Sequence, residues 1–286
     1  MHRHTASIRS HPRVPALRTP RPMPDSVPTP AVALAATALG FALLHLHATR
    51  RRNATWVDFG WAVAIGALAV AHAITGDGAP VQRAFAGLLG GTWGFRLAGH
   101  LLVDRILGRP EDARYVQLRA WFGRHATWHF AWFFQAQALL AVLLAWPFAL
   151  LADHAAPALA PVQIAGGVLF AVALFGESYS DHTLARWRAD PSRRGRTCRI
   201  GPWRFSRHPN YFCEWLIWVA FALAATPAPG GGWAWLAPLA MYLLIVHVTG
   251  IPHTEAQALR SRGDEYRDYQ RSTNAFFPGP PRATLR

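Results

Sequence analysis

The sequence predicts an all-α fold: a polytopic membrane helical bundle of about seven transmembrane helices, with the N-terminus outside and the C-terminus cytoplasmic. The first observation is a set of apolar runs longer than a soluble core helix needs, each bounded by Arg, Pro or Gly. The second is that arginine clusters follow alternate runs. The third is residues 201–215, where charged and polar groups meet the start of an apolar run; at that depth they are costly unless they hold a ligand.

The apolar runs divide the chain into seven predicted spans. In chain order they are residues 31–48, 56–75, 85–103, 128–151, 162–180, 211–226 and 233–251. Arg96 interrupts the third span, and the sixth and seventh are short or flanked by glycine. Tryptophans near span ends, such as Trp56, Trp128 and Trp233, are typical of anchors at the membrane interface.

Arginine placement predicts the topology. All 29 basic residues are Arg, and they cluster after the first, third, fifth and seventh spans. The turns at residues 76–80, 152–161 and 227–232 contain none. Short cytoplasmic loops retain positive charge, so we expect the Arg-rich loops in the cytoplasm, in a bacterial inner membrane. A nucleic-acid partner is disfavoured because these residues lie in short loops between spans.

The N-terminal tail, residues 1–30, conflicts with this topology because its arginines would lie outside. Its Pro, His and Arg content predicts disorder, and a start at Met23 would remove the conflict. The first span is similar to a signal peptide, but the arginines behind it, residues 50–52, are typical of a stop-transfer signal.

Cysteine and histidine patterns predict neither a disulfide nor a metal site. Cys198 and Cys213 lack metal-ligand spacing, and both fall on the predicted cytoplasmic side, where thiols stay reduced. Only the pairs at residues 45 and 47 and at residues 125 and 129 approach the clustered histidines that membrane di-iron enzymes need. The chain has no Walker loop and no Rossmann glycine signature.

The end of the fifth span carries an acid pair followed by arginines. Glu177, Asp181 and Arg188 share one helix face, and Arg186 lies nearby. Carboxylates accept from sugar hydroxyls and guanidinium groups grip phosphates, so the pattern suits a ligand with both. The alternative is an Arg-capped helix end with an internal ion pair.

The next segment places polar groups on the first turns of the sixth span. Pro209 can begin a helix, and Asn210 and Glu214 then face the same way. A buried Glu pairs with Arg or meets a ligand. The alternative to a ligand site is a pair of Glu214 with Arg207 or Arg204 that only pins the loop. Asp58 and Arg96 are charged residues inside the second and third spans. An ion pair between them that locks the two helices together is at least as plausible as a contact of either residue with substrate.

Long motifs in this chain resemble a known family. ESYSD at 177–181, GPWRFSRHPNYFCEW at 201–215, the tail at 250–278, and TWVDFGW and TWGFRLAGHLLVDRILGRPEDARY upstream resemble the steroid 5-alpha-reductase C-terminal family, and more closely its bacterial DUF1295 branch. The resemblance covers roughly residues 53–278. It implies a membrane reductase that binds NADPH from the cytosol and transfers hydride to an electron-poor carbon–carbon double bond of a hydrophobic lipid.

The resemblance also assigns regions and residues. It implies a substrate side at residues 31–152, a cofactor-binding region at 153–280 and a tail at 281–286. The residues it matches to the cofactor site, together with the arginines and Trp203 of the intervening loop, are Glu177, Asp181, Arg186, Arg188, Arg196, Trp203, Arg204, Arg207, His208, Asn210, Tyr211, Glu214, Glu255, Arg260, Tyr266 and Tyr269. The expected catalytic residues are Glu214, as a proton donor, and Tyr211, with Asp58 and Tyr115 standing in for the acid and tyrosine that hold a steroid ketone.

Two other functions compete with the reductase. Isoprenylcysteine and phospholipid methyltransferases, which use S-adenosylmethionine, also carry an Arg-His-Pro-x-Tyr segment before a membrane helix. In those families a small residue tends to follow the Tyr, whereas Phe212 and Cys213 stand here. A lipid-binding or scaffold protein without catalysis is the third class. The sequence leaves the lipid, the choice between NADPH and NADH, and the oligomeric state open.

Overall fold

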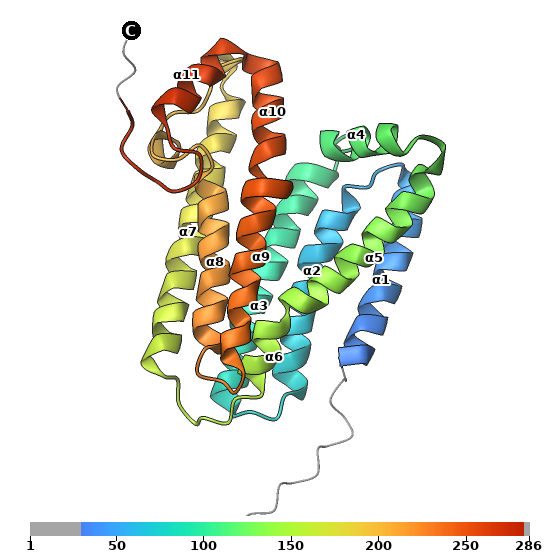
Figure 1. Ribbon diagram of the computed structural model, residues 1–286, viewed down its shortest axis with the longest axis vertical. Helices are drawn as coiled ribbons and strands as arrows, with labels where there is room; N and C mark the ends of the chain where they lie inside the picture. The colour runs from blue at the N-terminus through green and yellow to red at the C-terminus, as the bar shows by residue number, and fades with distance from the viewer. Residues whose placement is uncertain (1–29, 283–286) are drawn as a thin grey trace, which may run out of the picture.

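The computed structural model describes residues 30–282, which form a bundle of α-helices (Figure 1). Residues 1–29 and 283–286 lie outside the described part. The predicted disordered tail, apart from Pro30, and the alternative start at Met23 therefore lie there too.

The helices fall into two groups along the chain. The first contains α1 (Pro30–Arg51), α2 (Trp56–Thr75), α3 (Pro80–Leu101), α4 (Ala113–Phe122), α5 (Ala126–Leu144) and α6 (Trp146–Ala152). The second contains α7 (Pro161–Ala189), α8 (Pro209–Ala225), α9 (Leu236–Leu243), α10 (Ile251–Arg262) and α11 (Asp264–Ser272). Proline occupies the first turn of α3, α7, α8 and α10, where its missing N–H costs no helical hydrogen bond.

The chain is a polytopic helical membrane protein. Five helical segments are long and apolar enough to cross a membrane: Pro30–Arg51, Trp56–Thr75, Ala113–Ala152, Pro161–Ala189 and Gly231–Arg262. They correspond to the first, second, fourth, fifth and seventh predicted spans. The other two predicted spans are α3, which carries Arg83 and Arg96, and α8, which has 17 residues. Seven crossings therefore remain a prediction.

Two spans expected to be continuous helices are interrupted. The fourth breaks at Ala145, because Pro147 lacks the N–H that would continue the ladder, and a short α6 follows α5. The seventh contains a π-helical turn, Leu244–Val248, between α9 and α10. Gly250 lies between this turn and α10, and a Cβ atom there would lie 2.5 Å from the Ile245 carbonyl oxygen. Only glycine fits that approach.

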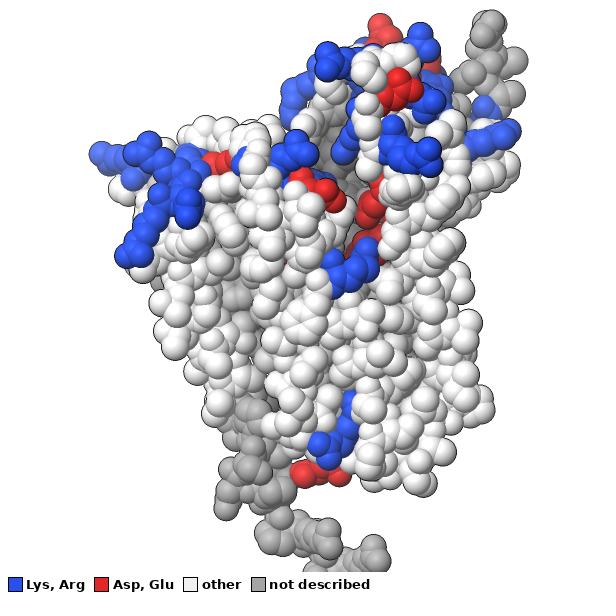
Figure 2. All heavy atoms as spheres, turned by 180° about the vertical axis from the view of Figure 1, so that it is seen from behind, with Lys and Arg blue, Asp and Glu red and all other residues white. Residues whose placement is uncertain are grey.

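The Arg-rich loops gather at one end of the bundle, as the alternation predicted. In Figure 1, the C-terminal end of α1, helix α4 and the junction of α10 with α11 all lie at the same end of the bundle. Figure 2 shows basic side chains concentrated at that end. Arg83 lies toward the opposite end and donates to the carbonyl oxygens of Ala73 and Ile74 at 2.8 and 2.6 Å. That the Arg-rich end faces the cytoplasm stays a prediction.

The two groups of helices share one apolar core. Trp93 of α3, Phe148 of α6 and Trp218 of α8 belong to the same buried cluster. The core therefore crosses the predicted boundary between residues 31–152 and 153–280, while the roles assigned to those regions stay predictions.

A buried amide pair joins the groups near the end away from the arginines. Gln163 on α7 donates to Gln82 Oε1 on α3 at 2.7 Å, and Gln82 donates back at 3.3 Å. Gln82 also donates to the carbonyl oxygens of Ala156 and Ala158. Both glutamines are fully buried. Such a satisfied pair holds α3 and α7 in one register at that end.

α2 and α3 approach each other closely where Gly94 faces Gly66. A Cβ at Gly94 would lie 2.6 Å from the Gly66 Cα and 2.8 Å from the Ala62 carbonyl oxygen. We expect Gly94→Ala to lower the free energy of unfolding by about 1–3 kcal/mol, because the helices must separate. In the matched control Gly99→Ala, on the same helix with open space around it, stability should stay equal or rise. Thermal unfolding in detergent compares them, and equal midpoints would contradict the close contact.

Candidate functional site

Three carboxyl groups lie near one another between α7 and α8, which run side by side (Figure 1). Glu177 and Asp181 are one turn apart on α7, and Glu214 enters from α8. Asn210 on α8 donates to Asp181 Oδ1 at 2.9 Å. From α3, Arg96 donates to Glu177 and, at 3.4 Å, to Ser178 Oγ. The predicted α7 face therefore meets α8 and also an arginine from the other half of the chain.

Glu214 is held by two indole groups. Trp93 Nε1 donates to one carboxyl oxygen at 3.0 Å, and Trp218 Nε1 donates to the other at 2.9 Å. Trp61 packs edge-on against Trp93, with ring centroids 5.7 Å apart. The alternative pairing of Glu214 with Arg207 or Arg204 is therefore wrong: aromatic donors, and no guanidinium, satisfy both oxygens.

The alternatives involving ion pairs within or between spans are also corrected. Arg96 pairs with Glu177, so it does not pair with Asp58, and Glu177 has no partner on its own helix. Asp58 instead accepts from Tyr115 Oη at 2.6 Å and from Arg114 Nη2 at 2.9 Å. A charge deep in a bundle takes the nearest donor in space, which sequence neighbours do not reveal.

Glu255 on α10 gathers several residues expected at the cofactor. Arg207 Nε donates to Glu255 Oε1 at 2.7 Å, and His208 Nε2 lies 3.2 Å from the same oxygen. Gln270 Nε2 donates to Oε2 at 2.8 Å, and Tyr266 Oη approaches at 3.5 Å. These side chains hold one another and tie the start of α8 to α10 and α11.

Other predicted cofactor residues also make contacts within the chain. Tyr269 donates to the Trp203 carbonyl oxygen, and the Trp203 indole donates to the Ser180 carbonyl oxygen at 2.9 Å. The Tyr211 ring stacks on His208 at 5.4 Å between centroids, and its hydroxyl lies 3.2 Å from Thr254 Oγ1. Tyr211 and Trp203 thus pack the loop between α7 and α8 against α10 and α11.

Arginines surround the open end of the carboxyl cluster. Figure 2 shows a hollow at the Arg-rich end, with acidic side chains on its wall and basic ones near its rim. The exposed arginines expected to bind a cofactor that form no ion pair within residues 30–282 are Arg186, Arg188, Arg196, Arg204 and Arg260. Arg188 lies within electrostatic reach of two arginines from other elements, Arg105 and Arg262.

Arg262 carries an unused donor. Its Nε is buried without a hydrogen-bond partner in the described chain, while its guanidinium stacks on Tyr266 at 4.9 Å. Sequence reasoning missed Arg105 and Arg262, and also the indoles of Trp93 and Trp218. The spacing of four residues between Glu214 and Trp218 is a sequence signal for their contact, because such residues lie on one helix face. Trp93, Arg105 and Arg262 have no such signal, since only the packing of distant helices brings them to the site.

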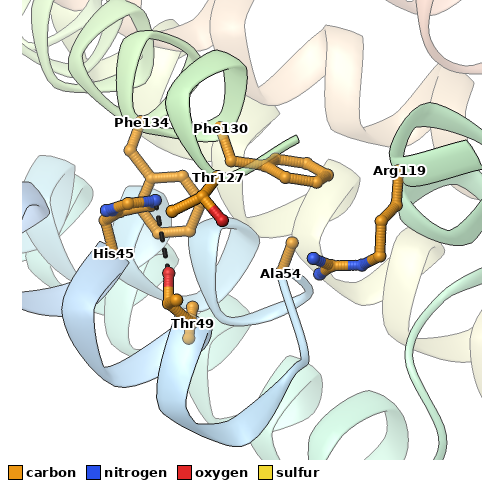
Figure 3. Close-up of a pocket in the computed structure, with 8 residues that line it drawn as sticks. His45, Thr49, Ala54, Arg119, Thr127, Phe130 and Phe134 are labelled. Carbon is orange, nitrogen blue, oxygen red and sulfur yellow. Dashed lines mark hydrogen bonds between the residues drawn. The ribbon is translucent and has the colours of Figure 1, made fainter. Parts of the chain in front are cut away.

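The small pocket on the outer face of the first half does not supply a substrate site. The pocket in Figure 3, lined by His45, Thr49, Arg119 and Phe130 among others, holds about 10 Å³, room for a single water at most. Arg119 in its wall pairs with Glu111 at 2.6 Å. Within residues 30–282, no three His, Cys, Asp or Glu residues are grouped so that they could hold a metal ion.

Comparison with known protein families gives a match over most of the chain. The family model described as a protein of unknown function, DUF1295, matches residues 44–273. No curated protein and no solved structure matches the chain. The matched region contains the carboxyl cluster and the residues around Glu255.

The buried His208 makes stability depend on pH. Burial lowers the pKa of His208, against the opposing effect of its hydrogen bond to Glu255. In the unfolded chain the imidazole titrates near pH 6.5. As the pH falls below about 6.5, the unfolded state therefore binds more protons and the folded state loses stability.

We expect the thermal midpoint in detergent to fall between pH 7.5 and 5.5, and to fall less in His208→Gln. His253, exposed on α10, provides the matched control, and His253→Gln should keep the parent's pH dependence. The same slope in His208→Gln and in the parent would show that this imidazole does not set the pH response.

Proposed function

This chain belongs to the DUF1295 family, and we propose that it is an integral membrane reductase. It uses NADPH to reduce an activated carbon–carbon double bond of a hydrophobic lipid, such as a steroid-like enone. The observation that carries the proposal is the group of carboxyls on α7 and α8 below a rim of arginines. Carboxylates, which can accept hydrogen bonds from sugar hydroxyls, lie there next to arginines, which can bind phosphates.

The residues around the hollow suit the chemical groups of NADPH. Arg188 with Arg105 and Arg262 offers a cluster of positive charge for the phosphates, and the unused Nε–H of Arg262 is one donor for them. Asp181, held by Asn210, is an acceptor for a ribose hydroxyl or the carboxamide. The arginines near the outer end and the acids within the bundle support an orientation with the phosphates toward the aqueous side and the nicotinamide toward the membrane.

When bound, NADPH would supply the hydride, one hydrogen with two electrons, that adds to the β-carbon of the enone. The electron pair of the double bond moves toward the carbonyl oxygen, and the α-carbon then takes one proton. Glu214 is the proposed source of that proton. Its carboxylate, once formed, is stabilised by the two indole N–H groups of Trp93 and Trp218.

Asp58 and Tyr115 are proposed to hold the lipid's carbonyl. The Tyr115 hydroxyl already donates to Asp58, and both lie in a network with Arg114 on the first half of the chain. A substrate carbonyl would have to replace Asp58 as the acceptor of the Tyr115 proton. Arg114 would then remain to satisfy the Asp58 carboxylate.

The proposed location is the bacterial inner membrane with the Arg-rich end in the cytoplasm. The density of arginine at that end supports this orientation, because short cytoplasmic loops retain positive charge. A cytoplasmic mouth also gives the site access to the soluble NADPH pool.

A methyltransferase remains the second candidate, and one observation favours it. Of the three acids Glu177, Asp181 and Glu214, only Glu177 forms an ion pair within residues 30–282, with Arg96, so the cluster has more acids than paired guanidinium groups. This excess would attract the cationic sulfonium of S-adenosylmethionine. Against it, the rim of arginines suits phosphates, which that cofactor lacks.

Calorimetric titration of the detergent-purified protein separates the two candidates. NADPH, NADH and S-adenosylmethionine are titrated in parallel, followed by loss of NADPH absorbance with enone lipids. We expect NADPH to bind and S-adenosylmethionine not to bind. Binding of S-adenosylmethionine alone would overturn the reductase and direct the search to lipid methyl acceptors.

Glu214→Gln tests the proton donor. We expect cofactor affinity to stay within a few-fold of the parent while turnover is abolished, because the amide cannot supply a proton. Trp93→Phe is the comparison: it removes one donor to the same carboxyl group but leaves the acid, and should retain measurable turnover. NADPH titration and absorbance give both quantities. Parent-like activity in Glu214→Gln would remove Glu214 from the mechanism.

Arg188→Ala tests the phosphate contacts. We expect NADPH binding to weaken by about 1.5–3 kcal/mol, the usual contribution of a hydrogen bond to a charged group. Arg271→Ala is the matched control, because Arg271 is exposed on α11 and pairs with Asp268 at 3.0 Å. Titration calorimetry measures both variants. Equal losses in the two would indicate a general charge effect and argue against a specific site at Arg188.

A further inference from the structure

A groove lies on the outer face of the bundle between α1 and α5, far along the chain from the carboxyl cluster. Its volume is about 250 Å³, and Ala42, His45, Trp128, Ala131, Trp132 and Gln135 line it. Figure 1 shows these two helices side by side at the edge of the bundle. The groove adjoins the small polar pocket of Figure 3 through His45, which lines both.

The walls of the groove are mainly apolar and combine large tryptophan side chains with small alanine side chains. Trp128 and Trp132 are 63% and 62% exposed, and their rings meet edge to face at 5.8 Å between centroids. Ala131, on the same helix as the two tryptophans, and Ala42 on α1 add only methyl groups to the lining. At the end away from the arginines, Gln135 donates to the Ala38 carbonyl oxygen at 3.2 Å, which satisfies its amide within the bundle. The groove thus offers a ligand mainly aromatic and methyl surface.

Unpaired cations stand at the other end of the groove. α1 ends in exposed Arg50 and Arg51, followed by Arg52, and Arg124 lies just before α5. Within residues 30–282, none of the four forms an ion pair with a carboxylate. Arg124 Nε instead donates to His125 Nε2 at 3.0 Å. Apolar walls with a cationic end match an acyl chain that carries an anionic headgroup.

From this arrangement we infer that the groove binds one acyl chain of an anionic phospholipid, with the headgroup phosphate on Arg50 and Arg124. The site is separate from the proposed cofactor site and does not depend on the proposed reaction. A volume of about 250 Å³ is much smaller than a membrane-spanning helix, which is about 10 Å wide and about 30 Å long. A second copy of the chain in the same membrane orientation would place its own arginines at the same depth, against like charges.

Native mass spectrometry of the full chain tests this inference. The detergent-purified protein is mixed with phosphatidylglycerol or phosphatidylcholine that carry identical acyl chains. We expect phosphatidylglycerol to be retained about tenfold more strongly, because the rim adds attraction for the anion. The double variant Arg50→Gln/Arg124→Gln should lose most of that preference, and Ala131→Phe, which fills the groove, should reduce retention of both lipids.

The control Arg267→Gln/Arg271→Gln removes the same charge from exposed sites on α11 and should keep the preference within about twofold. Equal retention of both lipids by the parent, or a preference that survives in the double variant, would overturn the inference. A two-chain complex that disappears in Ala131→Phe would also overturn it, because a second copy would then occupy the face.

Discussion

The ion pair of Arg96 and Glu177 joins α3 to α7 inside the bundle. Charged groups in such surroundings are stable only when opposite charges or donors satisfy them, so this contact sets the spacing of the helices around it. Once Glu177 takes the guanidinium, the remaining acids need other donors. Asp181 takes the amide of Asn210, and Glu214 takes the indoles of Trp93 and Trp218. The whole polar cluster follows from which helix brings which donor.

Side chains of the segment from Arg207 to Glu214 contact two different parts of the bundle. Arg207 and His208 face Glu255 and fasten α8 to the C-terminal helices. Asn210 and Glu214 face α7 and α3. A helix start at Pro209 explains this division, since residues before it belong to the loop and residues after it rotate around the helix. Residues that adjoin in sequence therefore serve different partners.

Much of the architecture could be predicted from the sequence because apolar length and arginine placement report directly on a membrane bundle. Pro147 is a sequence signal for the break in the fourth span, which the prediction of one continuous span over residues 128–151 missed. The faces of α7 and α8 also followed from helical spacing. The partners did not: Arg96 with Glu177, Trp93 with Glu214 and Tyr115 with Asp58 are more than 50 residues apart, and only helix packing decides which of several donors is nearest.

The amide pair of Gln82 and Gln163 fixes α3 against α7 at one end of the bundle. It clamps α3 to α7 at the end remote from the arginines, whereas the hollow lies at the other end. Separating α3 from α7 at the glutamine end would leave two buried amide groups without their partners, which makes this end of the bundle costly to open.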